Sequence, residues 1–116
     1  MRHIEDDLQK HCVGWFSLQY PKYAQLLHHS PNGGKRNALE GAKFKAMGVR
    51  AGFPDLGLYV ACGGYHGLFI ELKSAKGRQS ERQKFFQYML EEQGYRYVVV
   101  RSLLDFKIAI TNYFKL

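Results

Sequence analysis

Apolar side chains recur every three to four residues in two segments near the ends of the chain, which predicts a helix in each. The first helix covers residues 3–17 and ends before Pro21, which cannot continue it. Its apolar stripe consists of Ile4, Leu8, Cys12 and Trp15. The second helix begins at Ser102, and its packing side is expected to carry Leu103, Phe106, Ile110 and Tyr113.

Two further helices are predicted in the middle of the chain. Residues 37–47 show a weaker helical pattern, which stops at Gly48. A clearer helix has Ser80 as its N-cap and Gly94 as its C-terminal cap. The core face of this helix is expected to consist of Phe86, Met89 and Leu90.

Four apolar segments bounded by turn residues predict strands at 24–30, 55–61, 68–74 and 95–100. The glycine-rich turn at 62–67 joins the second and third strands as an antiparallel hairpin. The helix between the third and fourth strands requires a crossover, so this pair is expected to be parallel and right-handed. The pattern therefore indicates a mixed central β-sheet flanked by helices, an α/β or α+β domain.

The length of 116 residues suits one domain, which we expect to span residues 1–116. No segment approaches the roughly 18 apolar residues of a membrane span, and the polar N-terminus lacks the apolar core of a signal peptide. Cys12 and Cys62 fit neither a zinc site nor a disulfide framework. We therefore expect a protein of the reducing cytoplasm without a membrane partner.

The net charge of +7 favours a polyanionic partner, of which nucleic acid is the commonest. Many small basic proteins bind no nucleic acid specifically, so the charge alone does not decide the function.

Two acids and a lysine near the predicted hairpin are the candidate chemistry. Side chains alternate along a strand, so Glu71 and Lys73 share one face, and pairing of the hairpin brings Asp55 near them. Two close carboxylates repel each other unless a cation such as Mg²⁺ lies between them, and Gly57 is expected to leave room beside Asp55. The alternative is a solvated surface pair, worth about 0–1 kcal/mol.

The motifs "GFPDL" and "FIELK" resemble the PD-(D/E)xK nuclease signature, with Pro54, Asp55, Glu71 and Lys73 matching it. The ordered set "HSPNGGKR", "GVRAGFPDL", "IELK" and "SERQKFF" is similar to the VRR-NUC (virus-type replication-repair nuclease) family, and the similarity runs from Glu5 to the last predicted strand. The resemblance implies an α/β, restriction-endonuclease-like core of order α-β-β-β-α-β, here with an extra helix and a C-terminal helix. It also implies an endonuclease that depends on Mg²⁺ or Mn²⁺.

The resemblance assigns a role to each site residue. It places the metal on Asp55, Glu71 and the backbone carbonyl of Leu72, and it makes Lys73 the catalytic lysine. Glu5 matches an acid on the first helix, although it could equally be a favourable charge in a first helical turn. Gln83 matches a glutamine near the site, and its alternative role is a capping box with Ser80.

Basic side chains near the predicted site are expected to contact DNA phosphates without reading sequence. These residues are Lys35, Arg36, Arg50, Lys76, Arg78 and Arg82. His28, His29 and Asn32 are expected to be strand-end and turn residues that could line the cleft. The resemblance implies a homodimer acting on branched DNA such as four-way junctions, in a bacterial or phage-infected cytoplasm. The rival hypotheses are a nucleic-acid-binding module without catalysis and a scaffold domain derived from a nuclease.

Overall fold

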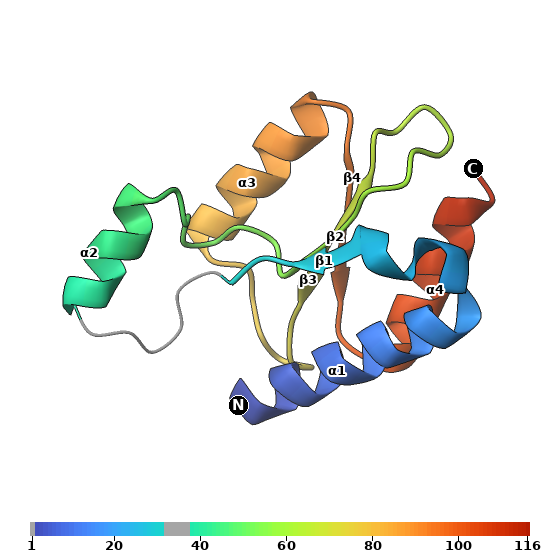
Figure 1. Cartoon of the computed structure of the whole chain (residues 1–116), viewed down its shortest axis with the longest axis horizontal. Coiled ribbons are helices and arrows are strands. Elements are labelled where there is room, and N and C mark those ends of the chain that lie inside the picture. Colours follow the sequence, from blue (N-terminus) through green and yellow to red (C-terminus); the bar gives the residue numbers. More distant parts are fainter. Residues whose placement is uncertain (1, 32–37) are drawn as a thin grey trace.

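Four strands form one mixed sheet within residues 2–31 and 38–116, the part of the chain that the computed structural model describes. Helices cover both faces of this sheet (Figure 1). The elements in chain order are α1 (Arg2–Gln19), a 3-10 helix η1 (Pro21–Leu26), β1 (Leu27–His29), α2 (Ala38–Ala46), β2 (Leu56–Leu58), β3 (Leu68–Leu72), α3 (Glu81–Glu92), β4 (Arg96–Val100) and α4 (Leu103–Phe114).

The sheet has the order β1-β2-β3-β4. β1 pairs with β2 and β2 with β3 in antiparallel fashion, whereas β3 and β4 are parallel. The predicted antiparallel hairpin and the predicted parallel pairing of the last two strands are therefore confirmed. The predicted α-β-β-β-α-β order is confirmed as well, with α2 as the extra helix and α4 as the C-terminal helix.

The predicted strand at 24–30 is wrong in its first half. Pro21 fixes a backbone angle that suits a helical turn, and residues Pro21–Leu26 form the 3-10 helix η1. Only Leu27–His29 joins the sheet. The predicted strand at 55–61 is also shorter, at Leu56–Leu58, although the Tyr59 amide still donates to the Leu26 carbonyl at 3.0 Å.

The hydrophobic core lies between the sheet and two helices, α1 and α4. Alternation along the strands turns one set of apolar side chains toward these helices. The sheet contributes Leu56, Leu58, Leu68, Ile70, Leu72 and Val100, and the helices contribute Cys12, Phe16, Phe106, Ile110 and Tyr113. The predicted packing side of α4 is confirmed at Phe106, Ile110 and Tyr113. On α1, Cys12 is buried as predicted, but Ile4 is 55% exposed, and the fully buried Phe16 was not predicted.

The opposite face of the sheet is covered by α3, none of whose residues is fully buried. Phe86 and Leu90 are half-buried, but Met89, predicted to face the core, is 42% exposed. The reason lies in the side of the helix that meets the sheet. Gln83 and Gln87 bond groups at or beside the sheet, so the contact side is centred near Phe86 and Gln87 and Met89 is turned outward.

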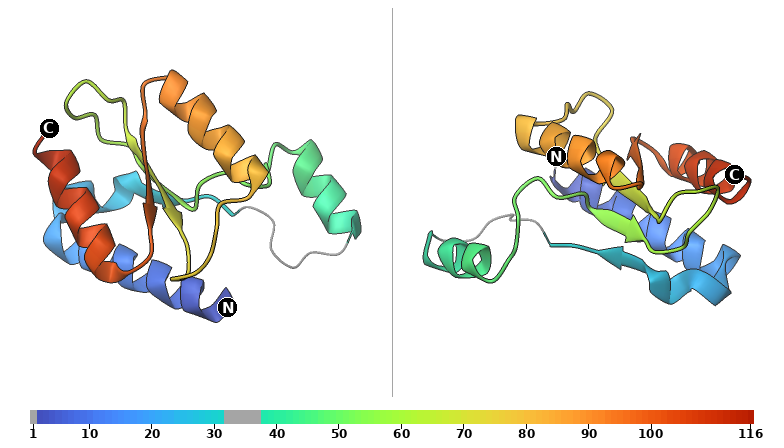
Figure 2. Two further views of the ribbon diagram at one scale, coloured as in Figure 1. Left: turned by 180° about the vertical axis from the view of Figure 1, so that it is seen from behind. Right: turned by 90° about the horizontal axis from the view of Figure 1, so that it is seen from above.

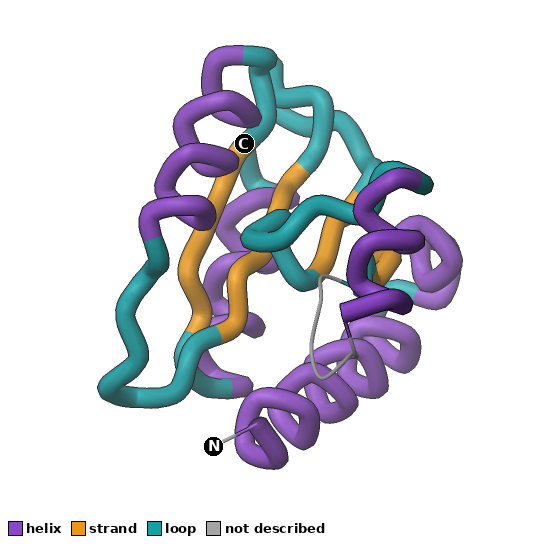
Figure 3. Tube along the Cα trace, turned by 90° about the vertical axis from the view of Figure 1, so that its left-hand side faces the viewer, coloured by secondary structure: helices purple, strands orange, loops and turns teal. Residues whose placement is uncertain are grey.

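The helix α2 stands at the end of the molecule opposite α4 (Figures 1 and 2). Viewed from the α2 end, the strands run between the surrounding helices (Figure 3). Within the described ranges, no helix combines the length and apolar character needed to cross a bilayer.

Candidate active site

Asp55 and Glu71 meet across the β2–β3 ladder. The register pairs Leu56 with Ile70, so Asp55, just before β2, lies beside Glu71 and Leu72 of β3. The backbone amide of Leu72 donates a 2.7 Å hydrogen bond to Asp55 Oδ2. The proximity of the two acids that strand alternation predicts is confirmed.

Glu71 is a buried carboxyl group with a strongly shifted pKa. Its side chain is only 2% exposed. Burial raises the pKa of Glu71 to about 9, and the negative charge of Asp55 contributes in the same direction. Glu71 Oε1 is buried, and no donor among the described residues bonds it; a hydrogen bond between the protonated Glu71 and Asp55 contributes to the raised pKa of Glu71. Without a cation, this shift of the pKa favours the protonated form of Glu71 at neutral pH.

Gln83 forms the predicted capping box and also contacts Glu71. Its side-chain oxygen accepts from the Ser80 backbone amide at 2.8 Å, and its backbone amide donates to Ser80 Oγ at 3.1 Å, which completes the capping box of α3. Its side-chain nitrogen donates to Glu71 Oε2 at 2.7 Å. Because the Ser80 amide must donate, the orientation of the Gln83 amide is fixed, with its N–H toward Glu71.

Lys73 and Glu5 both lie close enough to influence Glu71. The positive charge of Lys73 lowers the pKa of Glu71, whereas the negative charge of Glu5 raises it. Lys73 follows β3 directly, and its amide donates to the Val100 carbonyl at 3.0 Å. Glu5 is half-buried in the first turn of α1. The segment before β2, the residue after β3 and the first turn of α1 thus each place a charged group near Glu71.

The donor set at this point fits a hard divalent cation. No group of three or more His, Cys, Asp or Glu side chains comes together in the described ranges, so the protein ligands would be few. Mg²⁺ suits such a site, because it commonly binds one or two carboxylates and completes its shell with water and substrate oxygens. The unpartnered Glu71 Oε1 beside Asp55 is the observation that fits this ion.

Tyr97 and Gln79 belong to the site and are absent from the sequence prediction. Tyr97 pairs with Phe69 across β3 and β4, and only 5% of it is exposed. Burial raises the pKa of the Tyr97 hydroxyl, and the charge of Glu71 contributes. The Gln79 side chain donates to Tyr97 Oη at 3.2 Å. The one feature of the sequence that could have indicated Tyr97 is strand alternation, which places its side chain on the same face of the sheet as Glu71 once β3 and β4 are paired.

The space above Gly57 is filled differently from the prediction. Gly57 was expected to leave room beside Asp55, but the ring of Tyr59 lies against it. A Cβ atom at Gly57 would come within 2.9 Å of Tyr59 Oη and 3.0 Å of the Phe69 ring. Tyr59 remains 45% exposed, so its ring lies at the surface on the face that carries the two acids.

The predicted DNA-contacting residues that the structure describes are all exposed: Arg50, Lys76, Arg78 and Arg82. The Arg50 guanidinium donates to the carbonyl of Lys45 at 3.0 Å. The Arg82 guanidinium lies over the rings of Phe85 and Phe86, at 5.2 and 5.1 Å from their centroids. Asn32, Lys35 and Arg36 lie outside the described residues.

Arg101 anchors the loop between β3 and α3 by hydrogen bonds. Its guanidinium donates to three backbone carbonyls of this loop: Ser74 at 2.8 Å, Ala75 at 3.4 Å and Gly77 at 2.6 Å. Lys76 and Arg78 are carried by the same loop and point their charges outward as exposed residues.

The mixed sheet, the acids that meet across β2 and β3, and the lysine two residues after the second acid define a nuclease core of the restriction-endonuclease type. The profile of the VRR-NUC domain family matches residues 1–103. A solved structure described as a VRR_NUC domain protein shares 38% sequence identity and superposes with a TM-score of 0.84, over 97% of this chain and 88% of that chain. The chain therefore belongs to the VRR-NUC family, a family of nuclease domains that act on nucleic acid. No match was found among curated proteins.

Proposed function

We propose that this domain is a divalent-metal-dependent endonuclease that hydrolyses phosphodiester bonds in DNA. Asp55, Glu71 and the Leu72 carbonyl would hold Mg²⁺ or Mn²⁺. The single observation that supports this most strongly is the buried, unpartnered Oε1 of Glu71 next to a second carboxylate. Two ionised carboxylates at this spacing repel each other, and a cation between them removes that repulsion.

The chain's own residues have separate tasks in this proposal. When bound, the ion would supply positive charge to the phosphodiester and lower the pKa of water at the site. Lys73 holds a phosphate oxygen or orients the attacking water. Gln83 orients the carboxylate of Glu71 through its 2.7 Å hydrogen bond. Glu5 adds negative charge at the edge of the site, which favours the cation.

We infer branched DNA, such as a four-way junction, as the substrate. The cations Lys76, Arg78 and Arg82 lie on the loop and helix start next to Lys73, where they can contact phosphates without reading bases. Cutting both strands of a branch requires two sites, so a homodimer is the simplest functional unit.

The test compares cleavage of a four-way junction and a linear duplex, each with Mg²⁺, with Mn²⁺ and with chelator. We expect the wild type to cut the junction faster than the duplex and only with metal, and Glu71→Gln to cut neither. Analytical ultracentrifugation of the same sample gives the oligomeric state. Binding without any metal-dependent cleavage by the wild type would replace this proposal with a DNA-binding or scaffold domain.

A further inference from the structure

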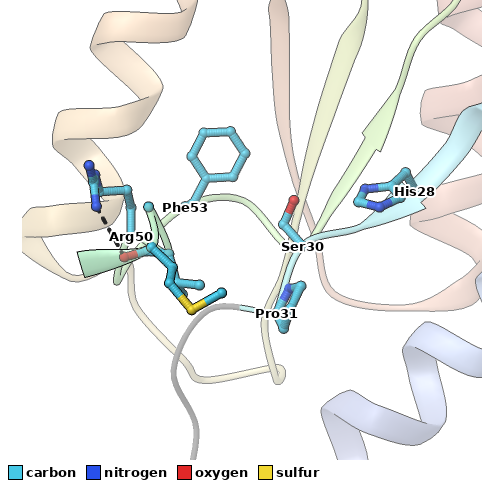
Figure 4. A pocket seen from close by; sticks show the side chains of 8 residues that line it. His28, Ser30, Pro31, Arg50 and Phe53 are labelled. Carbon is cyan, nitrogen blue, oxygen red and sulfur yellow. Dashed lines mark hydrogen bonds between the residues drawn. The ribbon is translucent and has the colours of Figure 1, made fainter. Parts of the chain in front are cut away.

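A cavity of about 340 Å³ opens beside the candidate active site, between β1 and the segment that joins α2 to β2. Phe53, Ser30, His28 and Arg50 surround it from both segments (Figure 4). Its volume lies in the range of pockets that take small organic groups, roughly 300–1,000 Å³. Neither the acids nor Lys73 line this cavity, so it is a separate feature of the same surface.

The cavity is tied to Asp55 by the backbone. The amide of Ser30 donates to the Asp55 carbonyl at 3.1 Å, and His29 Nδ1 donates to the same oxygen at 2.9 Å. Phe53 stands two residues before Asp55 in the sequence. A DNA strand whose phosphate reaches Asp55 and Glu71 would therefore pass next to the mouth of the cavity.

The lining is mostly apolar with a few polar groups. Phe53, Met47 and Val49 provide apolar walls, whereas Ser30 and His28 provide hydrogen-bonding side chains. Met47 is 68% exposed and thus has no role in the core. An aromatic ring with apolar neighbours and a few polar groups is the usual setting for an unstacked nucleobase.

The surroundings of the cavity are cationic. Arg50 is exposed and fixed in place by its hydrogen bond to Lys45, and Lys43 and Lys45 are exposed in the last turn of α2. Positive charge around an apolar cavity complements an apolar base attached to a phosphate backbone, and it disfavours a basic or purely apolar protein segment.

We propose that this cavity accepts an unpaired nucleobase of the DNA strand that lies across Asp55 and Glu71. The proposal rests on the proposed nuclease function and deepens it, because an occupied base pocket would select DNA with unpaired nucleotides over a continuous duplex. A base in a continuous duplex must be unpaired and unstacked before it can enter the cavity, which costs a few kcal/mol, and this cost is lower at a branch point, where the stack is interrupted, and lowest for an unpaired base.

The test measures the Kd of branched DNA by fluorescence anisotropy, with Ca²⁺ replacing Mg²⁺ so that binding is recorded separately from cleavage. Each nucleotide around the branch point is replaced in turn by an abasic residue. For the wild type we expect one position at which the loss of the base weakens binding by about fivefold or more, the scale of base stacking on protein side chains. In Met47→Ala the effect at that position should be clearly smaller.

Two matched pairs of variants separate the cavity from general packing. Met89→Ala removes an exposed methionine from α3, away from the cavity, and should keep the full effect. The rings of Phe53 and Phe86 contact each other, with centroids 5.3 Å apart, so Phe53→Leu and Phe86→Leu each remove this contact. Only Phe53 lines the cavity. We expect Phe53→Leu to lose the sensitivity to the abasic residue and Phe86→Leu to retain it.

The outcome distinguishes this proposal from the proposed function. If the wild type cleaves junctions with Mg²⁺ but its Kd responds to no abasic position, the pocket is not a nucleobase site and the nuclease proposal stands. An equal response in all four variants would overturn the pocket proposal in the same way. If an abasic residue at one position weakens binding by the wild type, and only Met47→Ala and Phe53→Leu lose this effect, the nucleobase pocket is supported. Absence of cleavage in the same samples would then contradict the nuclease proposal alone.

Discussion

The Gln83 side chain connects the N-terminus of α3 to the buried acid Glu71. One end of its amide accepts a hydrogen bond from the Ser80 backbone, and the other end donates to Glu71 Oε2 at 2.7 Å. With Oε2 occupied in this way, the remaining oxygen of Glu71 is available to the proton or to a cation. The cap of a helix thus sets the orientation of a proposed metal ligand.

Separate loss of the cap and of the contact with Glu71 should have different effects. Ser80→Ala removes the hydroxyl cap but leaves the backbone amide that holds Gln83, so it should lower the free energy of unfolding by about 1 kcal/mol and leave metal affinity nearly unchanged. Gln83→Ala should have a similar cost in stability and in addition weaken Mn²⁺ binding about 10–100-fold, the usual effect of losing a residue that orients a ligand. Urea unfolding and isothermal titration calorimetry measure the two quantities. Equal Mn²⁺ affinities would show that Gln83 is a capping residue alone.

Glu71 should make the metal-free protein less stable as the pH rises. Its pKa is raised from 4.5 to about 9 on folding, so the folded state holds the proton more tightly than the unfolded state. The proton on Glu71 therefore stabilises the folded state fully below about pH 4.5. Between pH 4.5 and about 9 this contribution to the free energy of unfolding is lost, at up to about 1.4 kcal/mol per pH unit. Glu71→Gln keeps a neutral group at all pH values. Urea unfolding with chelator should therefore show Glu71→Gln gaining stability over the wild type as the pH rises.

The control for that experiment is Glu81→Gln. The Glu81 side chain is 94% exposed, so this variant makes the same chemical substitution at a solvated position. Its stability should follow the wild type across the same pH range. Parallel curves for wild type and Glu71→Gln would contradict the buried, proton-binding state of Glu71.

Added Mg²⁺ or Mn²⁺ should stabilise the folded protein. A ligand that binds only the folded state adds about 2.7 kcal/mol at a concentration 100 times its Kd, which a thermal melt records as a rise in Tm. Asp55→Asn can still accept from the Leu72 amide, so it should fold, but it removes one of the two charges that attract the cation. We expect its Tm to be unchanged by metal. A similar rise in both proteins would place the ion elsewhere.

Phosphate contacts should be visible in the salt dependence of DNA binding. Lys76→Gln and Arg78→Gln each remove an exposed cation next to the site, and each should reduce the slope of log K against log[salt] by about 1. Lys115→Gln removes an exposed cation at the C-terminal end of α4, on the other side of the sheet, and should leave the slope unchanged. Slopes that fall equally in all three variants would indicate a diffuse effect of net charge.

Much of the fold follows from local patterns in the sequence. Helical periodicity predicts α1 and α4, and the strand alternation that places Asp55 beside Glu71 needs only the hairpin register. Ser80 and Gln83 form a recognisable capping box, and the structure contains it. These features depend on residues close in sequence or on a single strand pairing, which is why the sequence is sufficient for them.

The features that the sequence does not predict depend on distant segments. The bond between Gln79 and Tyr97 exists because the segment before α3 packs against β4. The outward position of Met89 depends on which side of α3 meets the sheet. The direction of the Tyr59 ring, folded over Gly57, is a side-chain rotation that strand alternation does not specify. The cavity forms only where β1 meets the segment before β2.

The three hydrogen bonds of Arg101 reduce the positive charge that the protein can offer to a nucleic acid. Of the 17 lysines and arginines, Arg101, like Arg50, directs its guanidinium at carbonyl oxygens of its own chain, so the formal charge of +7 overstates the number of cations free to meet phosphate. The same three hydrogen bonds order the loop that bears Lys76 and Arg78 before substrate binds. Binding of substrate therefore loses less conformational entropy in this loop. Arg101 directly follows β4, and Val100 at the end of β4 belongs to the hydrophobic core. The position of Lys76 and Arg78 therefore depends, through Arg101, on the packing of that core.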